Sequence, residues 1–247
     1  MDSIDNHLMI DYDKMAAEYA KYRDIHPEVF EALISEGKIA SSSRVLEVGC
    51  GTGNYMGRLS ELIGCQSYGI DPSEQMLSTA REKFPLLSLY TGKAEKLDFG
   101  QDYFDLVFSV DVIHHITDHS SYFREAHRVL KRGGKVCTVT DSEWIIRNRL
   151  PQSLYFPESA EAELKRYPKI SVIKDFMKEA GFNAISETMV EREYELNDIE
   201  GYRKKVFSSL LLMTEEEFQR GLKRMEEDLL KGSIKGISRY LLVWGIK

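Results

Sequence analysis

The sequence of 247 residues is poor in cysteine and proline and contains no long hydrophobic run. Its three cysteines are too few for a disulfide framework and point to a reducing compartment, so we expect a cytoplasmic protein. No apolar run approaches the roughly 20 residues that a membrane-spanning helix requires, and we expect no membrane span. The first residues, MDSIDNH, carry acidic side chains and no apolar segment, which argues against a secretory signal.

Positive charge is also in deficit, with 33 Lys and Arg against 40 Asp and Glu and a formal net charge of −7. An acidic protein repels polyanions, so nucleic acid is not the expected partner. Hydrophobic residues make up 43% of the chain and charged residues 30%, the proportions of an ordinary globular protein. A chain of this length can bury a large core without disulfides, and we expect a single domain.

Between residues 44 and 181, short segments rich in β-branched residues alternate with segments whose apolar residues have helical spacing. Such alternation predicts a parallel sheet with helices on both faces. A further antiparallel pair, 184–196 with 240–244, is expected to close the sheet. The other predicted strands are 45–48, 67–70, 87–90, 104–112 and 136–140, and the predicted helices between them are 55–63, 76–84, 122–130 and 172–177.

A glycine loop gives the strongest chemical signal, because Gly49, Gly51 and Gly53 alternate between a predicted strand and a predicted helix. Such glycines let a ligand lie against exposed backbone amides. A dinucleotide site needs the spacing G-x-G-x-x-G, but here the third glycine arrives one residue early and Asn54 takes its place. Glu47, just before the loop, would repel a pyrophosphate and favour a cation. These features favour S-adenosylmethionine, which is cationic; the alternative is a tight turn beside a solvated glutamate.

Asp71 ends the second predicted strand, beside the glycine loop. A carboxylate at this edge of a sheet can accept both hydroxyl groups of a ribose. It could instead, or in addition, cap the helix that follows Pro72.

Residues 44–140 resemble the class I S-adenosylmethionine-dependent methyltransferases, especially the small-molecule branch with the methyltransferase type 11 domain, related to ubiquinone and menaquinone C-methyltransferases. The fold class this implies is α/β, with a Rossmann-like, seven-stranded, mostly parallel sheet, an antiparallel last strand, helices on both faces and a helical lid. Five segments carry the resemblance: 46–53, 69–77, 92–97, 104–116 and 125–134.

The predicted organisation is one methyltransferase domain over residues 1–247. Its parts are an N-terminal helical cap at 1–40, a core at 41–197 and 237–247, and lid insertions at 142–168 and 198–236. The apolar residues of the first insertion show no regular spacing. The second reads as two helices, of which the later one begins with a capping box at Thr214.

The resemblance implies a role for each matching position. Glu47 and the glycine loop would hold the methionine moiety, and Asp71 would hold the ribose. In the N-terminal helix, the guanidinium of Arg23 would bind the carboxylate of the cofactor through two hydrogen bonds, and Tyr19 would cover the cofactor. The alternative is that Arg23 is exposed and Tyr19 belongs to the core. The remaining implied cofactor residues are Gly49, Cys50, Gly51, Gly53 and Asn54 in the loop, Pro72, Met76, Lys93, Ala94 and Glu95 around the adenine, and Val110 and His115 near the methionine end.

Catalysis of methyl transfer needs chiefly an in-line nucleophile in a dry pocket. A base is needed only if the acceptor must lose a proton. His114 and His115 follow the fourth strand, at the edge where such folds bind ligands, and are the candidates. A positional role for His115 and a packing or solvent-facing role for His114 are favoured over that of a base. The spacing of His115 and His119 permits a metal, but a predicted turn separates them and we predict no metal site.

Aromatic residues of the insertions are the candidate substrate contacts, namely Trp144, Tyr155 and Tyr202. They could line a lid or form small cores within the insertions. Arg147 and Arg149 could pair with an acidic group of the acceptor or lie exposed. We expect transfer of a methyl group from S-adenosylmethionine to a small-molecule acceptor, by in-line displacement in a lidded pocket. The alternatives are a tRNA or protein methyltransferase, a non-catalytic cofactor-binding regulatory module, and, less favoured, a nicotinamide dehydrogenase.

Overall fold

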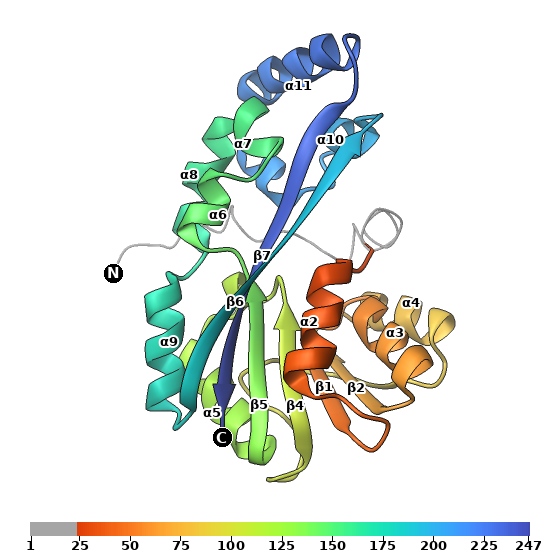
Figure 1. The fold of residues 1–247 in the computed structure, drawn as a ribbon, viewed down its shortest axis with the longest axis vertical. Coiled ribbons are helices and arrows are strands. Elements are labelled where there is room, and N and C mark those ends of the chain that lie inside the picture. The colour runs from red at the N-terminus through yellow and green to blue at the C-terminus, as the bar shows by residue number, and fades with distance from the viewer. Residues whose placement is uncertain (1–23) are drawn as a thin grey trace.

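The structure of the protein is a computed structural model that describes residues 24–247. The predicted cofactor residues Tyr19 and Arg23 therefore lie outside the described residues. The chain forms a seven-stranded sheet and an upper lobe of helices, and two long strands run from one into the other (Figure 1). Within the described residues, no helix is both long and apolar enough to cross a membrane.

The sheet has the strand order β3-β2-β1-β4-β5-β7-β6. Strands β1 to β5 pair in parallel, and β7 lies antiparallel between β5 and β6. This arrangement confirms the predicted Rossmann-like fold and the predicted closing pair. The strands are β1 (Arg44–Val48), β2 (Gln66–Asp71), β3 (Ser88–Thr91), β4 (Phe104–Val110), β5 (Leu130–Thr140), β6 (Asn183–Leu196) and β7 (Ile234–Ile246).

Both faces of the sheet are covered by helices. Adjacent residues of β1 show this, since Val45 belongs to one hydrophobic cluster and Leu46 to the other. Helices α5 and α9 pack in the cluster of Leu46, and α2 and α3 pack in the cluster of Val45. The helices of this core are α2 (Pro27–Gly37), α3 (Asn54–Ile63), α4 (Glu74–Lys83), α5 (His119–Val129) and α9 (Ile170–Glu179), with the 3₁₀ turn η2 (Ile113–His115) after β4.

The upper lobe has its own hydrophobic cluster. Helix α11 begins with the predicted capping box, in which Glu217 N donates to Thr214 Oγ1 at 3.3 Å and Thr214 N donates to Glu217 Oε2 at 2.9 Å. Its apolar stripe packs on the first insertion, where Phe218 stacks on Phe156 at 5.8 Å. The lobe comprises α6 (Glu143–Arg147), α7 (Gln152–Tyr155), α8 (Pro157–Arg166), α10 (Glu200–Arg203), η3 (Ser208–Leu212) and α11 (Glu215–Leu229), with the upper ends of β6 and β7.

The segment 142–168, for which the sequence predicts no element, forms the helices α6, α7 and α8. Two local predictions differ from the structure. The segment 198–232 forms three helical segments where two were predicted. The sequence Lys131-Arg132-Gly133-Gly134 predicts a glycine cap after the helix 122–130. That prediction is wrong, because α5 ends at Val129 and the glycine pair lies inside β5. Strand pairing explains this early start, since Leu130 pairs with Phe104 and Lys131 Nζ bonds the Asp105 carboxylate at 2.7 and 2.8 Å.

Candidate functional site

The glycine loop connects β1 to α3 with its three glycines in left-handed conformations. Gly49 (φ 72°) is tightly enclosed, because an added Cβ would lie 2.5 Å from a Val112 methyl group. Gly51 (φ 51°) differs, since an added Cβ there would meet nothing within 4 Å. The loop is therefore fixed on its inner side and open at Gly51, where a ligand could approach the backbone.

Asp71, at the end of β2, ties this loop to the neighbouring helix. Its Oδ2 accepts a hydrogen bond from Gly51 N at 2.8 Å, and its Oδ1 accepts one from Ser73 N at 2.9 Å. The alternative that Asp71 caps α4 is wrong, because Ser73 does so by accepting from Met76 N at 3.1 Å. A carboxylate oxygen can accept more than one hydrogen bond, so holding the loop is compatible with binding a ribose.

Glu47 is a buried acid in β1, with only 3% of its surface exposed. Burial raises the pKa of this carboxyl well above its usual value, a hydrogen bond from the Met56 backbone opposes the shift, and nearby Asp71 adds to it. The Oε2 atom has no hydrogen-bond partner among residues 24–247. A buried carboxylate oxygen without a partner is costly, and a cationic ligand would relieve that cost.

The other predicted cofactor residues lie after consecutive strands of the sheet. Ala94 is buried, and Glu95 Oε1 accepts from Thr117 N at 3.3 Å, which ties the segment after β3 to the segment after β4. Since β3, β2, β1 and β4 are neighbours in this order, their carboxyl ends form one edge. The remaining positions are Cys50 and Met76, which are buried, Asn54 and Val110, which are half-buried, and Pro72 and Lys93, which are exposed.

The two candidate catalytic histidines occupy η2. The ring of His114 stacks on Tyr167 with centroids 4.1 Å apart and also contacts the ring of His115 at 4.0 Å. Desolvation, and then the positive charge of Arg166, lower the pKa of His115 to about 4. Part of the His115 side chain remains exposed to solvent. This exposure makes the decrease in its pKa smaller but does not change the direction of the shift. His115 is therefore a neutral imidazole at pH 7, and His114 has a packing role.

A cavity of about 110 Å³ lies between the sheet edge and the upper lobe. Asp111, directly after β4, and Asp141, directly after β5, line it from the sheet. Arg149 and Glu163 line it from the upper lobe. Four tyrosines contribute to its wall: Tyr167, Tyr194, Tyr202 and Tyr240.

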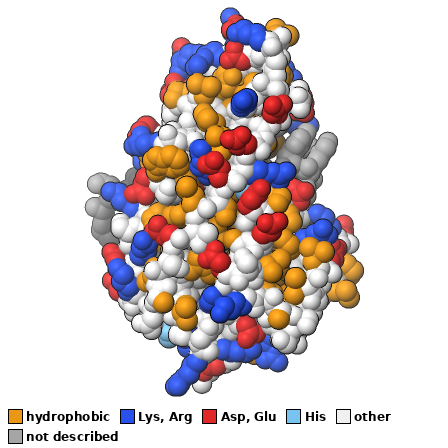
Figure 2. All heavy atoms as spheres, in the orientation of Figure 1, with side chains coloured by type: hydrophobic (Ala, Val, Ile, Leu, Met, Phe, Trp, Pro, Cys, Tyr) orange, Lys and Arg blue, Asp and Glu red, His pale blue; other side chains and the backbone are white. Residues whose placement is uncertain are grey.

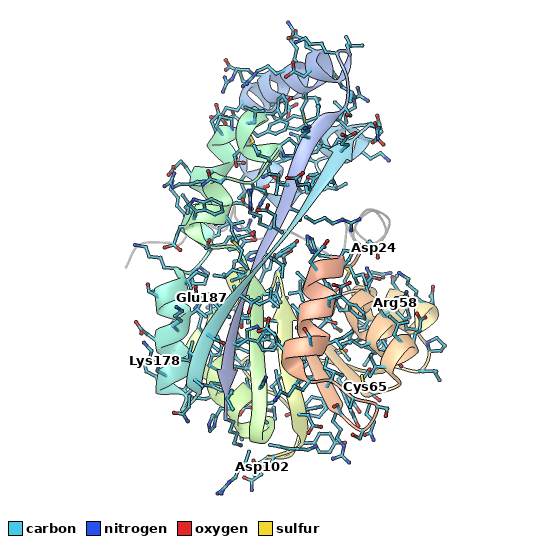
Figure 3. The ribbon with its side chains drawn as sticks, in the orientation of Figure 1. Asp24, Arg58, Cys65, Asp102, Lys178 and Glu187 are labelled. Atoms are coloured by element: carbon cyan, nitrogen blue, oxygen red, sulfur yellow. The ribbon has the colours of Figure 1, made fainter. Side chains whose placement is uncertain are left out.

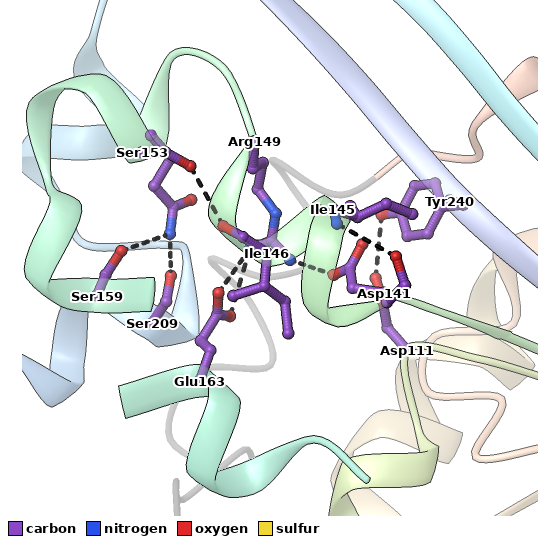
Figure 4. A network of polar contacts seen from close by, with 12 residues as sticks. Asp111, Asp141, Ile145, Ile146, Arg149, Ser153, Ser159, Glu163, Ser209 and Tyr240 are labelled. Carbon is purple, nitrogen blue, oxygen red and sulfur yellow. Dashed lines mark hydrogen bonds and ion pairs between the residues drawn. The ribbon is translucent and has the colours of Figure 1, made fainter. Parts of the chain in front are cut away.

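A buried ion network crosses this cavity (Figure 4). Arg149 Nη2 contacts the Asp141 carboxylate closely, and Arg149 Nη1 lies 3.0 Å from Glu163 Oε2. Both carboxylates are 4% exposed. Burial raises the pKa of Asp141 to about 7; Arg149 opposes this shift, whereas Asp111 and Glu163 reinforce it. Asp111 also accepts from Tyr240 Oη at 3.0 Å. The cavity is thus polar and rigidly built.

The predicted substrate residues separate into two groups. Tyr202 lines the cavity, whereas Tyr155 is buried in the upper lobe, where its hydroxyl donates to Asp228 at 2.9 Å. Trp144 is 54% exposed and lies outside the cavity wall, with the Arg239 guanidinium 5.2 Å from its ring. Sequence analysis missed the remaining tyrosines, Asp111 and Glu163. For Asp111 a signal existed, since it interrupts an apolar strand.

Comparison with known proteins identifies the family. The profile of a family described as a methyltransferase domain matches residues 46–138. A demethylmenaquinone methyltransferase of Staphylococcus epidermidis is 31% identical over 176 residues, which cover 62% of this chain and 73% of that protein. The chain belongs to the S-adenosylmethionine-dependent methyltransferases.

Other relatives agree with this assignment. The demethylmenaquinone methyltransferase of Chlorobaculum parvum is 28% identical over 159 residues, or 56% of this methyltransferase and 65% of that relative. This chain thus spans about 65% of the length of that relative. A solved putative methyltransferase from an antibiotic biosynthesis pathway of Anabaena variabilis has a TM-score of 0.69 at 22% identity, covering 91% of this chain and 99% of that one. That likeness shows the fold.

The described residues fit S-adenosylmethionine, the cofactor of this family. The orphaned Glu47 oxygen suits a cationic group, and the open side of Gly51 leaves space for a ligand against the backbone. A dinucleotide would instead bring a pyrophosphate toward this buried acid.

Asp71→Ala is expected to weaken the binding of S-adenosylhomocysteine by about 1.5–3 kcal/mol, the range for hydrogen bonds to a charged group. The variant loses the hydrogen bond that holds Gly51 as well as the predicted ribose contact. Calorimetric titration measures the loss. Glu74→Ala, an exposed neighbour in α4, is the control and should stay within about 0.5 kcal/mol of the wild type. Wild-type affinity in a folded Asp71→Ala variant would remove Asp71 from the site.

His115 is expected to titrate below pH 6.5 in the folded protein, because its surroundings lower its pKa. The unfolded chain binds a proton at this group first, so folding stability from His115 is present above pH 6.5. That stability is lost as the pH falls through the folded-state pKa. NMR titration of the histidine signals, assigned with His115→Gln, measures the midpoint. A midpoint at or above 6.5 would show that the ring is not desolvated.

Proposed function

We propose that this methyltransferase transfers a methyl group from S-adenosylmethionine to a small-molecule acceptor held in the cavity at Asp141. The observation that supports this most directly is that the glycine loop and the cavity are adjacent. Val112 packs against Gly49 of the cofactor loop, and Asp111, the preceding residue, lines the cavity. The predicted cofactor site and the cavity therefore meet at one turn after β4, where a methyl group could pass from one to the other.

The protein's part in this reaction is to bind, orient and exclude water. Glu47, Gly51 and Asp71 would hold the cofactor, which supplies a methyl group on a sulfonium when bound. The rigid wall of the cavity would hold the acceptor nucleophile in line, and such positioning contributes several kcal/mol to catalysis. The upper lobe, formed by the two insertions, would act as the lid that keeps the reacting groups dry.

Several observations favour a small acceptor over a macromolecule. The cavity is bounded by the upper lobe, and a folded RNA is too large to enter a volume of about 110 Å³. Acidic and basic side chains are interspersed over the face drawn in Figure 2, and the net charge is −7, so neither provides an attractive field for phosphates. Relatives are named as methyltransferases of demethylmenaquinone, a small molecule.

Labelled cofactor tests the proposal. The purified protein is incubated with methyl-labelled S-adenosylmethionine and, separately, with the small-molecule, tRNA and protein fractions of a cell extract. We expect label in the small-molecule fraction, and much less of it with Asp71→Ala. Label that enters bulk tRNA or unfolded protein instead would favour the alternative acceptors. Binding of the cofactor without any transfer would favour a regulatory module.

A further inference from the structure

The acceptor cavity carries an excess of negative charge. Asp111, Asp141 and Glu163 line it. Among the described residues, two arginines also line it, and one of them, Arg239, is already engaged outside the network, where it pairs with Glu191. Among residues 24–247, the carboxylates of Asp141 and Glu163 share the single guanidinium of Arg149, which leaves one negative charge more than positive charge within this buried group.

Arg149 is fully committed to its carboxylate partners. One of its terminal nitrogens contacts Asp141 and the other contacts both oxygens of Glu163, at 3.0 and 3.3 Å. An anionic acceptor would have to displace one of these buried pairs, and breaking such a pair is costly. The expectation that Arg149 binds an acidic group of the acceptor is therefore not supported. Arg147 is paired as well, with Glu161 at 2.6 Å, and lies outside the cavity wall.

Asp141 offers the opposite kind of site. Its side chain is 4% exposed, and its Oδ1 atom has no hydrogen-bond partner within residues 24–247, although Oδ2 contacts Arg149. A buried carboxylate oxygen in this position lacks the donor that would stabilise it. Within the part of the chain that the structure describes, Arg166 Nη1, at the end of α8, is a donor without a partner, but Arg166 does not line the cavity.

Aromatic rings surround the same space. Tyr167 follows α8, Tyr194 lies in β6 and Tyr202 lies in α10, and Phe207 joins them in the wall. Burial raises the pKa of each of these tyrosines, so they remain neutral phenols at pH 7. Neutral aromatic rings attract organic cations, more strongly where water is excluded.

We propose that the acceptor of this methyltransferase is a small organic cation, whose ammonium group binds beside Asp141 between the tyrosine rings. The proposal rests on the proposed function, because it names the substrate class of the same cavity. An ammonium would supply a donor to the orphaned Asp141 oxygen and balance the surplus carboxylate, while its alkyl part would contact the aromatic wall.

A matched set of three probes tests the charge preference. They are 3-methylbutylammonium, 3-methylbutanol and 3-methylbutanoate, which share one carbon skeleton and differ in the charge of the end group. Binding to the protein loaded with S-adenosylhomocysteine is measured by ligand-observed NMR. We expect the ammonium to bind at least about tenfold more tightly than the alcohol, as suits a charge-assisted hydrogen bond, and the butanoate to bind most weakly.

Two variants locate the preference. Asp141→Asn keeps the shape of the side chain and should bring the affinities of the ammonium and the alcohol to within about twofold, or ~0.4 kcal/mol. Glu163→Gln, which leaves the Arg149–Asp141 pair in place, should reduce the preference less. Asp102→Asn is the control, because Asp102 lies at the opposite end of the sheet (Figure 3) and is exposed, and it should keep the wild-type ratio.

The outcomes separate this proposal from the proposed function. If S-adenosylhomocysteine binds and the three probes bind equally, or none binds, the proposal is overturned and the cofactor assignment stands. Tightest binding of the butanoate would also overturn it. If S-adenosylhomocysteine does not bind at all, the proposed function fails, and the same probes on the unloaded protein still show whether the cavity selects a cation.

Discussion

Arg149→Met should destabilise the protein by about 3–5 kcal/mol, the usual cost of leaving a buried charge without its partner. The substitution keeps much of the side-chain volume but leaves Asp141 and Glu163 as uncompensated buried carboxylates. Arg147→Met is the matched control two residues away. The pair between Arg147 and Glu161 is 55% and 66% exposed, so its loss should cost less than about 1 kcal/mol. Denaturant unfolding at pH 8 measures both effects.

The pH dependence of this difference has a definite sign. The pKa of Asp141 is already raised in the folded protein, so its contribution to stability is present below the unfolded value and is lost as the pH rises through the folded value. Without Arg149 the pKa of Asp141 should rise further. The gap between wild type and Arg149→Met should therefore be smaller at pH 5.5 than at pH 8. An unchanged or larger gap at pH 5.5 would contradict the description of this network as a buried cluster with surplus acid.

Replacing residues 198–232 with a short turn should reduce turnover by about a hundredfold or more, the cost of misplacing the reacting groups. Leu196 pairs with Ile234, so the two strands arrive in a register that a tight hairpin turn can close. The deletion removes Tyr202 and η3 from the cavity wall but leaves the cofactor loop intact. Affinity for S-adenosylhomocysteine should thus change by less than about tenfold, or ~1.4 kcal/mol.

A substitution within the same segment provides the control for that experiment. Arg203→Ala removes exposed ion pairs with Glu200 and Glu226, and we expect it to leave both turnover and cofactor affinity close to wild type. Retained cofactor affinity shows that the shortened protein still folds. If the shortened protein methylates bulk tRNA or unfolded protein as well as the full chain does, the lid and the small-molecule acceptor are both wrong.

The core of the fold was predictable because its signals are local. The first strand was predicted at 45–48 and forms at Arg44–Val48, and the second was predicted at 67–70 and forms at Gln66–Asp71. Each is a short strand-like segment that ends at a glycine or at Asp71-Pro72. The capping box at Thr214 also formed as predicted, since it depends on residues within one helical turn.

The upper lobe and the acceptor cavity were harder to predict for a physical reason. Helices as short as α6 and α7 are not stable by themselves and depend on tertiary packing. Such short helices do not require a regular spacing of apolar residues, so the sequence gives little sign of them. Glu163 shows the same difficulty at the level of one residue. Glu163 lies in α8 near Glu158 and Glu161, and nothing in the sequence distinguishes it from these two glutamates. Of the three, only Glu163 is buried, because Arg149 from another segment lies against it.

The long β6–β7 pair has a mechanical consequence. Its register is continuous from Ser186–Trp244 in the core to Leu196–Ile234 in the upper lobe, so the same ladder of hydrogen bonds belongs to both parts. The two strands therefore offer no flexible hinge, and any swing of the lobe must bend or break that ladder. Native-state amide exchange along one strand would then report a gradient, with local opening near Ile234 and global unfolding near Val243.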